Sequence, residues 1–242
     1  MPPGGARPMS TLPAAIVEAW RLVASLDPRL GDIVGLSLRV SLSAVAIASV
    51  VGLPLGAFIA VSRFPARRTT IVLLNALMGL PPVVVGLLVY LMLSRAGPLG
   101  ALGLLFTPSA MVIAQAILIT PIVAALTRQV VEDAWLEYRE QLRSLGESRL
   151  GSVATLLWDL RFSLVTIVLA GFGRAAAEVG AVIIVGGNID GVTRVMTTAI
   201  ALETSKGDLP LALGLGLILV TIVVALNAAA YLVKETAQRR YG

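Results

Sequence analysis

Two residues of opposite charge lie one helical turn apart in an otherwise apolar stretch. Arg174 and Glu178 fall within residues 163–185, where most neighbours are Leu, Val, Ile, Ala or Gly. Charge at the centre of a membrane helix is costly and normally faces the bundle interior or water. At this spacing the two groups can neutralise each other, which favours an internal ion pair that holds the helix against its neighbours. The alternative is that Arg174 is a cationic group facing a path for anions.

Composition excludes most other chemistry. The chain has no Cys and no His, so it can form no disulfide, zinc cluster, haem histidine ligand or His-centred triad. It also lacks the GxxxxGK[ST] sequence that holds ATP phosphates, because Lys206-Gly207 has the reverse order. We therefore expect no catalytic residue, metal site or cofactor site in this chain, and any energy source must lie elsewhere.

Membrane helices must position the charged pair. Of 242 residues, 57% are hydrophobic, 14% charged and 5% aromatic, a composition typical of packed membrane helices rather than of soluble domains or β-barrels. We predict an all-α integral membrane protein. Five stretches contain the roughly 20 apolar residues that a membrane span needs. They are residues 40–62, 70–93, 108–127, 163–185 and 209–233.

The basic residues predict the orientation of the chain. Eleven follow the first, third and fifth stretches, whereas six lie in the opposite loops and the N-terminal segment. The positive-inside rule places the eleven in the cytoplasm, so we expect the N-terminus outside and the tail, residues 234–242, inside. The net charge of +5 then reflects orientation. Without a basic stripe among stacking aromatics, we expect no nucleic-acid partner.

Residues 1–32 form a predicted leader and interfacial helix. Residues 1–10 are rich in Pro and Gly and are expected to be disordered. Residues 12–30 have helical apolar spacing opposite charged positions, which favours an amphipathic helix in the outer membrane interface over a cleavable signal. Disorder is the alternative there.

Proline interrupts three predicted spans. Each proline removes a backbone donor, and the freed carbonyl is tolerated mainly where the backbone is buried or lines a wet path. We interpret Pro54 as a packing kink. The second and third spans are expected to be broken near a pathway, at Pro81, Pro82, Thr120 and Pro121.

Small and polar residues predict contacts between the spans. Gly52 and Gly56 form a GxxxG pattern, which allows two helix backbones to approach closely. Four uncharged polar residues are expected to donate hydrogen bonds between helices: Asn75, Gln115, Thr120 and Asn227.

Residues 128–162 are more highly charged than the apolar stretches on either side, with five basic and six acidic residues. Apolar residues at 3–4 spacing predict an amphipathic helix up to Leu145, which Gly146 ends, and helix formers resume from Leu150 to Leu160. The apolar stripe suggests docking on a cytosolic partner. Packing against the protein's own helix ends is the alternative.

The seven residues from Glu140 to Gly146, EQLRSLG, resemble the EAA-loop signature of bacterial ABC importer permeases. Glu140, Leu145 and Gly146 match this pattern. Gln141 and Leu142 depart from it by replacing its two alanines, and Trp158-Asp159 stands where the pattern has Leu-Pro.

A longer similarity follows the loop. Residues 170–188 (AGFGRAAAEVGAVIIVGGN) and 193–207 (TRVMTTAIALETSKG) resemble the tungstate-uptake branch of these permeases, close to the molybdate and sulfate permeases. The resemblance covers about residues 33–233.

The resemblance implies a type I ABC importer permease, with residues 33–233 as the permease domain. It implies a homodimer with the path at its interface in a bacterial or archaeal cytoplasmic (inner) membrane. Two ATP-binding subunits would bind ATP and Mg²⁺ on the cytoplasmic side, and an external oxyanion-binding protein would deliver tungstate.

The resemblance also implies roles for particular residues. The family's coupling helix, which docks on the ATPase, maps onto Glu140, Leu142, Arg143, Leu145 and Gly146. We expect the external loop 186–208 to contact the binding protein or to form an outer gate, and the spacing of Met196, Ala199 and Ile200 predicts a short helix within it. Its candidate residues are Gly186, Gly187, Asn188, Thr193 and Arg194.

Other functions remain as alternatives. A molybdate or sulfate permease would share these features, because no residue here measures the size of an oxyanion. An ion-coupled secondary carrier could use Arg174 and Glu178 as its coupling centre, but such carriers usually have more spans and inverted repeats. A membrane scaffold would not need broken helices.

Overall fold

The computed structural model describes Val17, Arg21 and residues 28–241, and every regular element within residues 28–241 is helical. The all-α prediction is therefore confirmed. Most of the predicted leader and interfacial helix, residues 1–32, lies outside the described residues.

Two long helices cross at the centre of the bundle, α2 (Pro28–Val61) and α5 (Pro108–Ser144). Each begins with a proline, which suits a helix start because no N–H partner exists there. They share the most extensive helix contact in the described part of the chain. A Cβ on Gly56 would collide with the carbonyl oxygen of Ala124, so this crossing requires glycine. The close contact predicted from the GxxxG pattern is present.

Helix α2 begins earlier than the predicted span at residues 40–62. Its apolar segment runs Leu30–Val61. The charged residues Asp32 and Arg39 interrupt the apolar pattern in the sequence. In the structure both side chains are exposed on the surface of the helix, which continues past them. Pro54 lies within α2 and does not end it.

The second predicted span is broken, as expected. It forms α3 (Arg67–Met78) and α4 (Pro82–Leu93), which meet at 97°. A residue that precedes proline is pushed away from helical dihedrals, and Pro81 accordingly adopts an extended conformation before Pro82 starts α4.

The predicted break at Thr120-Pro121 is wrong. Pro121 lies buried within α5, which continues without interruption. The Thr120 hydroxyl donates to the carbonyl oxygen of Ala116 at 2.7 Å, and packing around a buried proline allows a membrane helix to continue. Because α5 extends to Ser144, the third span and the first half of segment 128–162 form one helix.

The predicted fourth span, residues 163–185, is also wrong as a single helix. Helix α6 (Arg149–Asp159) meets α7 (Arg161–Ala176) at 78°, and α7 ends before α8 (Gly180–Gly186) begins. Glu178 lies in the gap, where its side chain accepts a hydrogen bond from the N–H of Ala181. The helix therefore restarts after Glu178 rather than passing through it.

The last two helices follow the expectation more closely. The short helix predicted in the external loop is α9 (Met196–Lys206), and the fifth span is α10 (Leu209–Tyr241). Helix α10 continues through the predicted tail to Tyr241.

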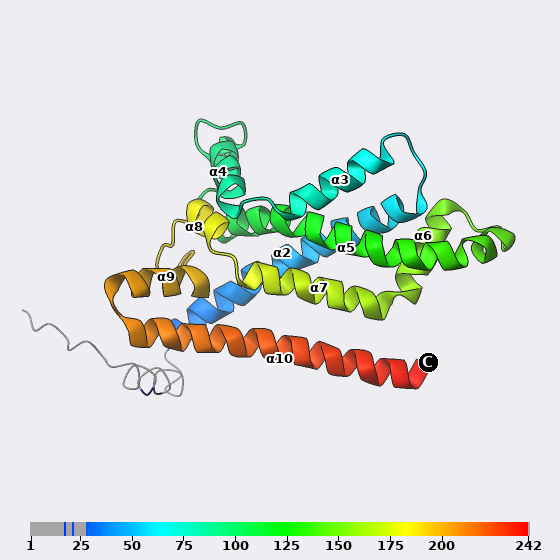
Figure 1. Cartoon of the computed structure of the whole chain (residues 1–242). Helices are drawn as coiled ribbons and strands as arrows, with labels where there is room; N and C mark the ends of the chain where they lie inside the picture. The colour runs from blue at the N-terminus through cyan, green and yellow to red at the C-terminus, as the bar shows by residue number, and fades with distance from the viewer. Residues whose placement is uncertain (1–16, 18–20, 22–27, 242) are drawn as a thin grey trace, which may run out of the picture.

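Figure 1 shows α2, α5, α7 and α10 running along the length of the molecule. Helix α6 and the C-terminal end of α10 lie at one end, and α4, α8 and α9 lie at the other. The α6 end carries most of the charges predicted to be cytoplasmic. Three described helices are long and apolar enough to span a membrane, and the number reaches five if each of the two bent pairs, α3–α4 and α6–α7, is one span.

Candidate functional site

Two broken segments meet at the end of the molecule opposite α6. Helix α4, which follows the Pro81-Pro82 break, packs against α8, which follows the gap at Glu178. A Cβ on Gly86 would lie 2.8 Å from the Cα of Ala181. The two short helices therefore contact each other through their backbones.

The Arg174–Glu178 pair lies beside this contact. An Arg174 guanidinium N–H donates to Oε2 of Glu178 at 2.6 Å. The Glu178 side chain is 3% exposed and that of Arg174 is 35% exposed. The pair predicted from spacing is therefore formed, at the end of α7 rather than at the centre of a continuous helix.

Glu178 also connects three helices. Its Oε1 accepts from the N–H of Ala181 at 3.1 Å, at the start of α8. Its backbone carbonyl accepts from the Thr197 hydroxyl of α9 at 2.8 Å. With both carboxylate oxygens occupied, Glu178 is a structural anchor, whereas Arg174 is the partner that retains exposed surface.

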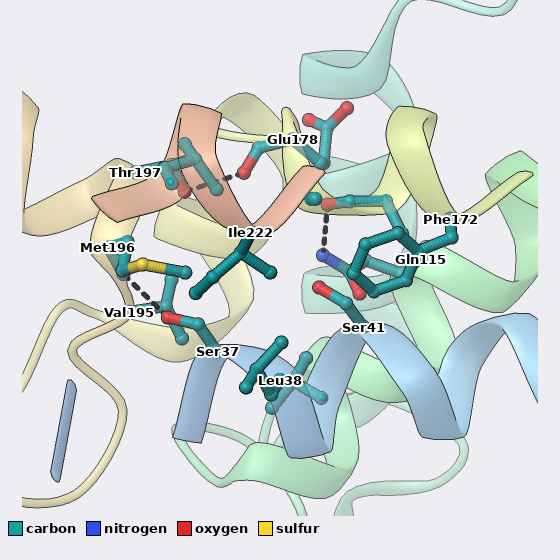
Figure 2. Close-up of a pocket in the computed structure, with 14 residues that line it drawn as sticks. Ser37, Leu38, Ser41, Gln115, Phe172, Glu178, Val195, Met196, Thr197 and Ile222 are labelled. Atoms are coloured by element: carbon teal, nitrogen blue, oxygen red, sulfur yellow. Dashed lines mark hydrogen bonds between the residues drawn. The ribbon is translucent and has the colours of Figure 1, made fainter. Parts of the chain in front are cut away.

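A small cavity lies next to this anchor (Figure 2). Its volume of about 10 Å³ has room for roughly one water molecule. Gln115 and Ser41 line it. The Gln115 amide donates to the backbone oxygen of Ala175 at 3.1 Å, as Figure 2 shows, while its buried Oε1 has no hydrogen-bond partner. Gln115 thus makes the predicted hydrogen bond between helices and leaves one acceptor at the cavity.

The loop after α8, which the sequence predicts to be external, is held by its own polar groups. The Thr193 hydroxyl donates to the carbonyl oxygen of Gly186 and accepts from the N–H of Ile189 at 2.9 Å. Asn188 donates to the carbonyl oxygen of Thr198, and Arg194 pairs with Asp190 at 2.9 Å. The structure therefore brings together the predicted loop residues.

Gly187 has a specific reason to be glycine. Its φ is +71°, in the left-handed region, and a Cβ there would lie 2.9 Å from the ring of Phe106. Either constraint alone disfavours a side chain.

Thr120 and Pro121 line an apolar groove with Leu80, which lies in the break between α3 and α4. Thus two of the predicted pathway elements are neighbours. The groove is largely hydrophobic, and the Thr120 hydroxyl is bonded within its own helix rather than to a neighbour.

At the other end of the molecule, α5 and α6 form a hairpin. Gly146 adopts φ +75°. Its N–H donates to the carbonyl oxygen of Arg143, and the N–H of Glu147 donates to that of Leu142. This pair of bonds is a Schellman motif, which ends a helix at a left-handed glycine.

The predicted coupling residues differ in exposure. Leu142 is buried against Val61 and Leu156 in a small core. Leu145 is 71% exposed at the tip of the hairpin, and the Glu140 side chain is 86% exposed. The core fixes the hairpin, whereas apolar and acidic side chains are exposed at and near its tip.

Sequence reasoning missed several residues of the junction. Nothing in the sequence distinguishes Gly86 from other glycines in membrane helices. Its role, to let α8 approach the backbone of α4 closely, is seen only in the structure. Ser37 accepts from the N–H of Met196 at 2.7 Å, which ties α2 to α9. Thr197 donates to the backbone of Glu178. Ser and Thr are frequent in apolar helices, so no sequence signal distinguished these two.

Comparison with known proteins identifies related chains. The family described as "binding-protein-dependent transport system inner membrane component" matches residues 52–242. The tungstate uptake system permease protein TupB of Peptoclostridium acidaminophilum is 44% identical over 217 residues, 90% of this chain and 95% of the relative. TupB of Campylobacter jejuni is 40% identical over 173 residues, 72% of each chain. The molybdenum transport system permease protein ModB of Escherichia coli is 31% identical over 188 residues, 72% of this chain and 80% of the relative.

Proposed function

The chain belongs to the family of binding-protein-dependent transport system inner membrane components, and from that premise we propose that it is the membrane subunit of a tungstate importer. Permease subunits of this family are not catalytic themselves. Two TupB relatives support tungstate, because their identity to this chain exceeds that of ModB. Molybdate and sulfate remain the alternative substrates.

The observation that carries the proposal is the α5–α6 hairpin. Its tip exposes Leu145 and its sides are fixed by a buried core, so a partner that moves the tip moves α5 as well. Because α5 is continuous from Pro108, such a displacement reaches the opposite end of the bundle. The family implies an ATP-binding partner and a substrate-binding protein, and our proposal places the ATP-binding partner at this tip.

A charged network connects α5 to the broken helix. Arg67, in the first turn of α3, donates to Glu132 of α5 at 2.7 Å and to the carbonyl oxygen of Ile59 at 3.0 Å. A second arginine, Arg128, also pairs with Glu132. Movement of α5 therefore pulls on α3 and on the end of α2.

The proposed mechanism is alternating access in a homodimer. ATP-driven closure of two ATP-binding subunits moves the paired hairpins and opens the path outward, and hydrolysis resets it. The groove at Thr120, Pro121 and Leu80 is our candidate for the surface between the two copies, because it is apolar and adjoins the α3–α4 break. Five spans with an external N-terminus complete this proposal.

Uptake by cells tests the substrate. Cells with and without this chain, both containing the ATP-binding subunit and the binding protein, are given tungstate with molybdate or sulfate as competitors. The proposal expects the loss of a tungstate signal that a modest excess of molybdate cannot suppress. Loss of molybdate or sulfate uptake instead would keep the permease and replace its substrate.

A further inference from the structure

A cationic cavity lies between the end of α2 and the α5–α6 hairpin. Its volume is about 80 Å³, several times the space that one water needs. Its charged lining consists of Arg63, Arg143, Arg149 and Glu147. None of these three arginines forms an ion pair with a described residue.

The contacts in the cavity leave the positive charge available. The Arg143 guanidinium lies over the ring of Trp135, 5.9 Å from its centroid, which orients it without neutralising it. The carboxylate of Glu147 packs against Gly151 in the first turn of α6. One carboxylate against three guanidinium groups leaves an excess of two positive charges around the cavity.

We propose that this cavity binds a tetrahedral phosphate group, from a phospholipid headgroup or from free phosphate. The planar guanidinium fork matches phosphate oxygens with two parallel hydrogen bonds. Val61, the last residue of the apolar α2, lines the same cavity, which therefore lies where an apolar membrane segment gives way to charged chain. Basic pockets at such positions suit lipid headgroups.

Binding there would have a mechanical consequence. Arg63 follows α2, whereas Arg143 and Arg149 belong to the two arms of the hairpin. A phosphate held by all three fixes the hairpin against α2. This inference does not depend on which substrate the chain transports.

Tryptophan fluorescence of the full-length chain tests the site. The chain has three tryptophans, so replacing Trp20 and Trp158 with Phe leaves Trp135 as the reporter in the cavity. The protein is placed in dodecyl maltoside micelles, which contain no phosphate, and titrated with inorganic phosphate, with chloride at equal ionic strength as the anion control. A parallel preparation adds phosphatidylglycerol to the same micelles and contains no inorganic phosphate.

We expect a saturable change in Trp135 emission in at least one arm and none with chloride. A response to inorganic phosphate in the lipid-free micelles identifies free phosphate, and a response to phosphatidylglycerol alone identifies the lipid headgroup. Arg63→Gln and Arg149→Gln should each weaken the response about tenfold, the effect of one lost charge-assisted hydrogen bond. Arg139→Gln removes the same charge from α5 outside the cavity lining and should leave it unchanged.

Circular dichroism and gel filtration establish that each variant is folded. Should Arg63→Gln fail this check, Arg149→Gln still tests the site, because its side chain is exposed in the first turn of α6. Flat Trp135 emission in both arms, or a response equally strong in the Arg149→Gln variant, would overturn the proposal.

Discussion

Glu178 illustrates how one side chain can end a membrane helix and begin the next. Its carboxylate accepts from Arg174 of α7 and from the backbone at the start of α8. Its burial makes both partners necessary, because an uncompensated carboxylate in an apolar interior is costly. The ion pair favoured from the sequence is therefore formed, and its role as an anchor stays a prediction. The sequence shows the i,i+4 spacing of Arg174 and Glu178. It does not show that Glu178 also accepts a hydrogen bond from the backbone at the start of α8.

Breaking this pair should destabilise the protein. Arg174→Gln leaves a buried, unpaired carboxylate, and we expect a loss of about 2 kcal/mol, less than for a fully buried pair because the arginine is 35% exposed. The measurement is the apparent melting temperature in detergent.

The control is the double variant Arg174→Gln with Glu178→Gln. Glutamine keeps the acceptor for the Ala181 N–H and carries no charge, so most of the stability should return. A double variant as unstable as Arg174→Gln alone would contradict the anchor role. If the double variant is stable but does not transport, Arg174 belongs to the path.

At the scale of elements, apolar patterns predicted which segments are helical but not where all of them stop. The break at Pro81-Pro82 was predictable because two prolines constrain the backbone locally. The gap at Glu178 was not predictable, because the Thr197 hydroxyl of α9, which bonds the Glu178 backbone there, comes beside it only in the fold. Pro121 had the opposite outcome, because tertiary packing kept α5 intact around it.

The α2–α5 crossing provides a test of close packing. Gly56→Ala should cost about 1–3 kcal/mol, because its Cβ would meet the α5 backbone rather than a movable side chain. Gly35→Ala on the same helix is the control, since a Cβ there has nothing within 4 Å. Thermal unfolding of both variants in the same detergent compares them. Equal stability would show that the crossing is looser than described.

The hairpin turn provides a second test at this scale. Gly146→Pro should abolish uptake while the chain stays in the membrane, because proline cannot adopt φ +75° and lacks the N–H that bonds Arg143. Uptake and membrane content are measured on the same cells. Unchanged uptake would remove the hairpin from the coupling mechanism.

Leu145→Ser separates docking from folding. Leu145 is 71% exposed, so its loss should weaken binding of the ATP-binding subunit with little effect on the fold. Leu136→Ser is the matched control, because Leu136 is also exposed on α5 but lies away from the tip. Co-purification with the ATP-binding subunit is the measurement, and equal retention by both variants would place the contact elsewhere.

At the scale of the whole molecule, we propose different roles for the two ends of the helix bundle. One end holds the hairpin and its arginines, and the other holds the contact between α4 and α8 where both broken segments converge (Figure 1). The continuous helix α5 joins the ends. In the mechanism that we propose, ATP-driven movement begins at the hairpin end, and the path opens and closes at the other end.

The most direct measurement is tungstate accumulation in proteoliposomes containing this chain, its ATP-binding subunit and the tungstate-loaded binding protein. The account predicts accumulation that requires ATP and stops when the ATP-binding subunit is omitted. Accumulation by this chain alone on an ion gradient would contradict it and would identify a secondary carrier instead.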